Sequence, residues 1–156
     1  MHGLVQLYKD GKLLFKKHNQ IQDGSKIIEA NLLAGNTNFK PSAIYIEFQN
    51  SGTPEAPTFT TAEGIEYYTS LSSEKDYLVI PLVIKPEVSD NTVTFSAVIT
   101  GGTGAKNGLV CGSSTKAYGA ALVSEQAGEV YARMYFDEPI TLTDDVQYYL
   151  PWTITF

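Results

Sequence analysis

Apolar and polar side chains alternate along much of this chain, and the clearest case is residues 148–156. Every second residue from Leu150 to Phe156 is large and apolar, and the residues between them include Thr153 and Thr155. Successive side chains of a strand point to opposite faces, so this period of two predicts a half-buried β-strand. We expect this end of the chain to be packed into a sheet and not to form a free tail.

Similar patterns predict strands in seven further segments, which are residues 4–8, 12–17, 43–49, 77–85, 91–100, 116–125 and 129–137. Asp10-Gly11 stands between the first two of these segments. Glycine accepts positive φ at little cost, so this pair predicts a tight β-hairpin.

Residues 23–34 are the one good helix candidate. Asp23 or Ser25 can cap the first turn, and Gly35 can stand just past the end. One side of this helix would be apolar, with Ile27, Ile28, Leu32 and Leu33.

Many short strands, turn-rich connections and a single early helix predict a mainly β fold. We expect an antiparallel, jelly-roll-like β-sandwich with one short N-terminal helix. We assign residues 1–156 to a single domain, with residues 1–18 as its N-terminal hairpin and residues 23–34 as its helix.

Residues 77–85 are apolar on both faces of the predicted strand. Such a strand is covered on both sides, by a second layer or by a partner chain. Pro81 has no N–H for a ladder and so marks a sheet edge or a bulge, which favours a subunit contact. The candidate interface residues of this segment are Tyr77, Val79, Pro81 and Val83.

Tyrosine is frequent, with ten copies against seven phenylalanines and one tryptophan. Tyr131 and Tyr135 share one face of a predicted strand, and Tyr148-Tyr149 is a doublet. Exposed aromatic side chains can fill a subunit interface or stack on sugars, or they can simply cover a partly buried sheet. We add Tyr131, Tyr135 and Tyr148 to the candidate interface residues.

The formal net charge of −6 argues against a nucleic-acid partner, because an acidic domain repels phosphate backbones. Cys111 is the one cysteine, which rules out an internal disulfide.

No segment approaches the roughly 20 apolar residues of a membrane span. The first residues lack the pattern of a signal peptide. We expect folding in the cytosol, without a membrane partner.

Residues 101–106 are rich in glycine and end in Lys106, but the Ser/Thr and the helix of a phosphate-binding P-loop do not follow. We interpret residues 101–115 as a loop and name Gly101, Thr103 and Lys106 as candidate docking residues. Residues 50–68, rich in Pro, Thr, Gly and Glu, predict a second long loop.

Catalytic groups are not apparent in the sequence. Only His2 and His18 can serve as histidine bases, and no Gly-x-Ser-x-Gly elbow accompanies them. The acidic pairs Asp137-Glu138 and Asp144-Asp145 are interpreted as solvated acids beside turns, and the spacing of a calcium loop is missing. We expect no enzyme activity, no metal and no cofactor.

The order of these segments resembles that of small structural proteins of tailed bacteriophage virions. The matching features are a short helix ending in Leu-Leu-Ala-Gly (residues 27–35), a strand and an acidic, Thr-rich loop (43–49 and 53–66), a Thr-Val-Thr-Phe strand (91–99), a Gly-Ala-Ala-Leu-Val-Ser-Glu segment (119–125), an Arg-containing strand running into Pro-Ile (132–140) and a closing Trp-Thr-Ile-Thr-Phe (152–156). The resemblance covers most of the chain and fails at residues 69–85 and 101–115.

This resemblance implies a non-enzymatic virion protein that acts by multivalent docking to other capsid or tail proteins. It also implies several copies or a homo-oligomer, assembled in the host cytoplasm. We place it first on the capsid surface, as a decoration or head-fibre protein, and second in the tail or baseplate as a fibre adaptor. A carbohydrate-binding module that recognises a host glycan, through its tyrosines and loops, is the alternative from another class.

Overall fold

The computed structural model describes residues 1–47, 77–99, 114–143 and 146–156. Nine strands, one α-helix and one short 3-10 helix lie in these ranges. In chain order they are β1 (His2–Lys9), β2 (Lys12–Ile21), α1 (Gly24–Leu33), η1 (Thr37–Phe39), β3 (Ala43–Glu47), β4 (Tyr77–Pro81), β5 (Glu87–Ser89), β6 (Thr92–Ile99), β7 (Ser114–Ser124), β8 (Glu129–Thr143) and β9 (Tyr148–Thr155).

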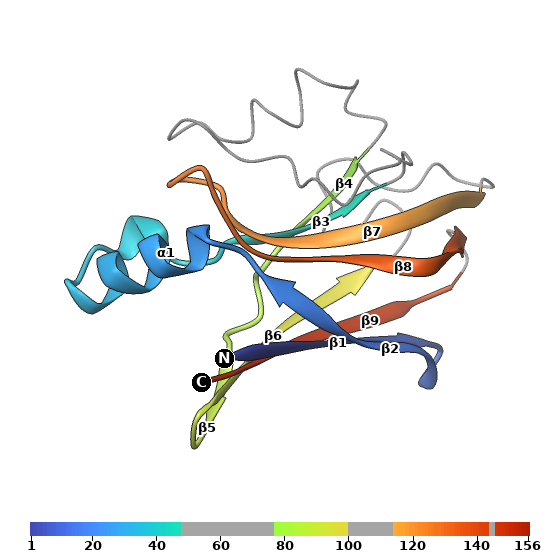
Figure 1. Ribbon diagram of the computed structural model, residues 1–156. Coiled ribbons are helices and arrows are strands. Elements are labelled where there is room, and N and C mark those ends of the chain that lie inside the picture. Colours follow the sequence, from blue (N-terminus) through green and yellow to red (C-terminus); the bar gives the residue numbers. More distant parts are fainter. Residues whose placement is uncertain (48–76, 100–113, 144–145) are drawn as a thin grey trace.

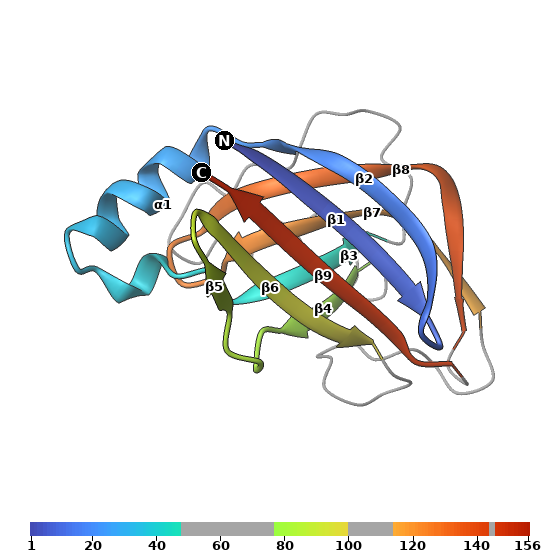
Figure 2. The same cartoon turned by 90° about the horizontal axis from the view of Figure 1, so that it is seen from below.

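The strands form two antiparallel sheets that lie over one another (Figure 1). The first sheet has the order β4-β3-β7-β8 and the second has the order β2-β1-β9-β6-β5, with a junction between β8 and β2. Helix α1 lies at one end of the sandwich, and the tip of the β1–β2 hairpin lies at the other (Figures 1 and 2). The predicted mainly β, antiparallel sandwich with one early helix is confirmed, whereas the jelly-roll connectivity stays a prediction.

One hydrophobic core fills the space between the sheets. Apolar side chains from strands of both sheets and Ile28 of α1 contribute to it. Because each strand sends alternate side chains inward, the period of two in the sequence places these residues in the core. The alternation in residues 91–100 predicts Val93, Phe95, Ala97 and Ile99 as the inner residues of β6; the last three are buried, and Val93 is partly buried against the core.

The β1–β2 hairpin turns at Asp10 and Gly11, as predicted. Both residues have positive φ, 48° and 79° respectively. This geometry matches the right-handed twist of the two strands, and Asp and Gly tolerate it better than branched residues do. Lys9 and Lys12 pair directly across the turn.

Strand β9 lies inside the second sheet, between β1 and β6. On one side His2 of β1 pairs with Thr155 of β9, and on the other side Thr92 of β6 pairs with the same threonine. The Trp152 side chain is fully buried, which confirms that this segment is packed into a sheet. Phe156, expected on the buried face, is instead 53% exposed, because it lies just beyond the last residue of the strand.

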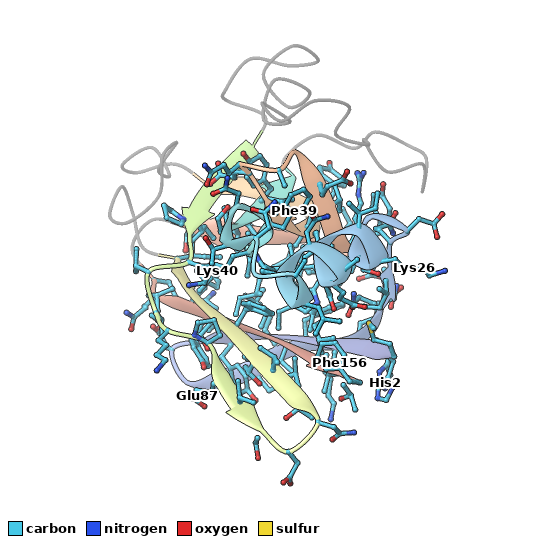
Figure 3. The ribbon with its side chains drawn as sticks, turned by 90° about the vertical axis from the view of Figure 1, so that its left-hand side faces the viewer. His2, Lys26, Phe39, Lys40, Glu87 and Phe156 are labelled. Atoms are coloured by element: carbon cyan, nitrogen blue, oxygen red, sulfur yellow. The ribbon has the colours of Figure 1, made fainter. Side chains whose placement is uncertain are left out.

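Helix α1 is confirmed, and it ends as predicted, with Gly35 at φ +87° just past its last turn. Asp23 stands at the N-cap but makes no capping hydrogen bond through its side chain. Its backbone is already helical, whereas capping side chains usually project from an extended residue. Of the four predicted apolar residues only Ile28 is buried, and Leu33 is 92% exposed. Figure 3 views the sandwich from this end, with Lys26 on the helix and with His2 and Phe156 close together below it.

Strand β8 is longer than the predicted strand, and it contains Asp137 and Glu138 instead of ending at them. Gly119 pairs with Tyr135, and Ala117 pairs with Ile140. One residue of β7 therefore faces four residues of β8, and this bulge directs the two carboxylates into solvent. The expectation that they flank a turn is wrong, although both side chains are exposed as expected.

Strand β4 is the outer strand of its sheet and pairs with β3 alone in the described part of the chain. Pro81 is its last residue, so the predicted edge position is confirmed. Ile80 points into the core and is buried, whereas Val83, two residues past the strand, is exposed.

We expect Trp152→Ala to lower the free energy of unfolding by about 3–5 kcal/mol, because it removes a fully buried aromatic side chain. Phe156→Ala is the matched control, and it should cost less than about 0.5 kcal/mol because that ring is largely exposed. Urea denaturation measures the loss in each variant, with circular dichroism as the signal because Trp152→Ala removes the tryptophan fluorescence. Equal losses in the two variants would contradict the central position of β9.

Candidate docking groove between strands β2 and β8

Strands β2 and β8 join the two sheets over a very short distance. Their ladder has only two residue pairs, Gln20 with Arg133 and Ile21 with Ala132. The N–H of Gln22 also donates to the C=O of Tyr131, at 3.0 Å. From Gln20 toward Lys12 the two strands separate, and Figure 1 shows β8 above the β1–β2 hairpin near the hairpin tip. The sandwich is therefore open on this side.

Lys17 spans the opening. Its Nζ donates to the backbone C=O of Tyr135, at 3.1 Å, and forms an ion pair with Asp137. Lys17 pairs with Val5 in the β1–β2 ladder, so its side chain starts from the core-facing side of the hairpin. An ammonium group has three donors. One of them takes the place of the strand N–H that would have bonded this carbonyl if the ladder had continued.

An open depression of about 510 Å³ lies on the hairpin-tip side of this ion pair. Phe15 of β2 and Phe136 of β8 meet beside it edge to face, with ring centroids 4.9 Å apart. The depression has an apolar floor and a charged rim, and its lining residues are Lys9, Leu14, Phe15, Asp137, Glu138, Pro139, Ile140 and Thr141. We call it the β2–β8 groove.

A smaller hollow of about 210 Å³ lies on the helix side of the same ion pair. Lys17, His18 and Arg133 give it a basic lining. Arg133 is 3% exposed, and its guanidinium carbon lies 4.8 Å from the centroid of the Tyr135 ring. A buried cation beside an aromatic face therefore lies at the junction of the sheets.

Two of the three tyrosines predicted to be exposed are buried. Tyr148 is 0% exposed and accepts a hydrogen bond from the N–H of Thr143, and Tyr131 is 4% exposed. The Tyr131 hydroxyl donates to Glu29 of α1, at 2.6 Å. A one-residue shift of register between Leu122 and Val123 turns Tyr131 inward. The expectation that these two side chains lie on the surface is wrong.

The other predicted interface residues are spread over the molecule. Tyr135 is half-buried beside the basic hollow, and Pro81 and Val83 lie at the far edge of the first sheet. The backbones of Tyr77 and Val79 pair with Glu47 and Tyr45. The predicted docking residues Gly101, Thr103 and Lys106 lie outside the described residues, as do Cys111 and Asp144-Asp145.

The two histidines meet across neighbouring strands, with ring centroids 5.9 Å apart. Among the described residues there is no group of three or more His, Cys, Asp or Glu side chains that would hold a metal ion. The helices in the same ranges are all too short or too polar to cross a membrane. Comparison of the chain with protein-family models, with curated proteins and with solved structures found no match.

The sequence contained one signal for the groove that its alternation pattern did not reveal. Four of the eleven basic residues lie at Lys9, Lys12, Lys16 and Lys17, on a hairpin in an acidic chain. Lysines concentrated on one strand are typical of an exposed sheet edge. Strand β2 does have such an edge, from Lys12 to His18, in the part of the chain that the structure describes.

Tyr131 predicts a specific loss of stability at high pH. Burial, and then the hydrogen bond and charge of Glu29, raise its pKa above the ordinary value of about 10. The folded protein therefore keeps this proton above pH 10, whereas the unfolded chain releases it. The contribution of the Tyr131 hydroxyl to the free energy of unfolding is fully present below pH 10. Above pH 10 the free energy of unfolding falls by up to about 1.4 kcal/mol per pH unit.

The wild type and Tyr131→Phe should therefore differ in slope above pH 10, and the variant should lose stability less steeply. Denaturant unfolding between pH 8 and pH 11 measures this. Tyr8→Phe is the control. Tyr8 is partly exposed, and the hydrogen bond described for its hydroxyl is with Gln6 and not with a carboxylate. Parallel curves for the wild type and Tyr131→Phe would contradict the linkage.

Lys17→Met should cost about 1–2 kcal/mol of unfolding free energy, because the Tyr135 carbonyl loses its donor. Asp137→Asn removes only the ion pair with Lys17, in which the Asp137 side chain is largely exposed, and should cost about 0–1 kcal/mol. Urea denaturation of both variants separates the two contributions. A larger loss for Asp137→Asn than for Lys17→Met would show that the carbonyl contact is unimportant.

Proposed function

We propose that this chain is a non-enzymatic structural protein of a tailed phage virion, which works by docking to neighbouring virion proteins in several copies. The capsid surface is its first proposed place, as a decoration or head-fibre protein, and the tail or baseplate is the second. The resemblance in segment order supports this proposal, and so does the distribution of exposed apolar side chains on a small sandwich.

The observation that carries the proposal is the presence of exposed aliphatic side chains at both ends of the sandwich. Leu13 and Leu14 are about half exposed near the tip of the β1–β2 hairpin. Ile27 and Leu33 are exposed on α1, at the opposite end (Figure 2). Clustered exposed apolar residues mark protein contacts more often than scattered ones do. Exposed aliphatic side chains at opposite ends suit a protein that connects two neighbours.

Carbohydrate binding remains the second candidate, because one aromatic pair favours it. The rings of Tyr8 and Tyr149 lie side by side on the outer face of the second sheet, with centroids 6.0 Å apart. The Tyr149 hydroxyl is hydrogen-bonded to Ser96, and the Tyr8 hydroxyl accepts from Gln6. Aromatic rings fixed in this way offer faces for sugar stacking.

The test begins with mass spectrometry of purified virions of the phage that encodes this chain. We expect the protein to be a stoichiometric component. Particles that lack it should then bind the purified wild type, and binding should fall at least tenfold for Leu13→Asp with Leu14→Asp, and for Ile27→Asp with Leu33→Asp. All four residues are exposed or half exposed, so the melting temperature should change little.

Val88→Asp is the matched control, since Val88 is an exposed aliphatic residue of the edge strand β5 and belongs to neither cluster. It should bind particles as the wild type does. Absence of the protein from virions would refute the proposal. Saturable binding to a glycan array that Tyr149→Ala abolishes would favour the carbohydrate-binding candidate instead.

A further inference from the structure

We propose that the β2–β8 groove binds an extended segment of a partner protein, which adds to β2 as a new strand. The segment would alternate aliphatic and acidic residues. This inference deepens the docking function proposed above, because it names the chemistry of one docking contact. It rests on the direction of backbone groups in β2, on the shape of the groove and on the charge of the open β2 edge.

The backbone of β2 has hydrogen-bonding groups that point toward the β8 side, along the open edge that runs beside the groove and the basic hollow. The N–H of Gln22 donates toward β8, and groups two residues apart in a strand point the same way. The groups of Gln20, Lys16 and His18 therefore face the same side. At Gln20 the partner is Arg133 of β8, but at His18 and Lys16 strand β8 has moved away. A row of such groups is a template for an added strand.

The groove has the shape and polarity that an added strand needs. Its floor is apolar and contains Leu14, Phe15 and Ile140, and its volume is about 510 Å³. Alternate side chains of an extended segment would lie on this floor, and the others would point to solvent. The Lys17–Asp137 ion pair closes one end of the groove.

The charge of the open β2 edge selects the partner. Residues 9–17 carry four lysines and one aspartate, in a chain whose net charge is −6. Lys16 pairs with Gln6, so its side chain lies on the outer face of the hairpin, away from Asp137 and Glu138 in the groove lining. Lysines on an open edge repel most added strands and so protect against aggregation. A strand with carboxylates opposite Lys16 is the one class that they attract, because opposite charges across neighbouring strands stabilise the pair. The same lysines thus protect the edge and confer specificity.

The probe for this inference is a soluble octapeptide of alternating glutamate and valine with blocked ends. We expect saturable binding to the full-length protein, measured by fluorescence anisotropy, and weaker binding as salt is raised. In nuclear magnetic resonance spectra, the amides of Lys16 and His18 should shift and become protected from exchange. A peptide of alternating lysine and valine should bind at least tenfold more weakly.

Position 16 offers a matched pair of variants. Lys16→Pro removes an N–H that faces the open edge, whereas the β1–β2 ladder uses the groups of the neighbouring odd residues. It should weaken peptide binding at least tenfold. Lys16→Thr removes the charge but keeps the N–H, and it should weaken binding by about threefold. Circular dichroism checks that both variants fold.

A glutamate–valine peptide that is N-methylated at every residue keeps the test decisive if Lys16→Pro does not fold. It lacks backbone donors on both edges and should not bind the wild type. The inference is overturned if the unmodified peptide does not bind saturably, if the N-methylated or lysine peptide binds equally well, or if folded Lys16→Pro binds as the wild type does. Because no particle is used, these results are independent of whether the virion proposal holds.

Discussion

Strand β2 belongs to both sheets, and its two contacts impose opposite demands. Along most of its length it follows β1 through the hairpin turn, which fixes it in the second sheet. At Gln20 and Ile21 it also continues the first sheet beside β8. A twisted two-sheet sandwich cannot keep both ladders over the whole strand, because the sheets separate to make room for the core. The opening beside β2 follows from this constraint.

Local chemistry at the opening compensates for the interrupted ladder. Lys17 supplies a donor to the Tyr135 carbonyl, Phe15 packs edge to face on Phe136, and Arg133 is buried against the Tyr135 ring. The first two contacts cross the gap between β2 and β8. The third lies within β8, at the junction of the sheets. Strand β8 has its bulge at Asp137 and Glu138, beside the gap. These contacts hold β2 and β8 together on both sides of the gap.

Alternation in the sequence identified most of the framework. It located β9, β6 and the hairpin, and the turn chemistry of Asp10-Gly11 and Gly35 placed two chain reversals correctly. The pattern also contained the burial of Tyr148, since this residue shares its parity with Leu150 and Trp152, but its interpretation as half of an exposed doublet concealed that. Tyr131 was different, because a change of register reverses the facing of a residue without altering the composition of its neighbours.

The groove itself was beyond a residue-by-residue interpretation. Whether two strands stay paired depends on the twist and separation of whole sheets, which distant residues determine together. Only the concentration of lysines on one hairpin reported the open edge, and its meaning becomes clear once β2 is seen beside β8. The apolar residues of α1 were likewise visible in the sequence, but the sequence did not show which side of the helix packs on the core.

The pairing of His2 with Thr155 has a consequence for how the protein is made. Strand β1 leaves the ribosome well before its neighbour β9, because His2 and Thr155 are 155 − 2 = 153 residues apart. At roughly 5–20 residues per second, synthesis of that stretch takes roughly 8–30 s. Throughout that interval the nascent hairpin has a second open edge, beside the one that faces the groove. Contacts so distant in sequence also slow folding, so early recruitment of chaperones would protect the hairpin until β9 arrives.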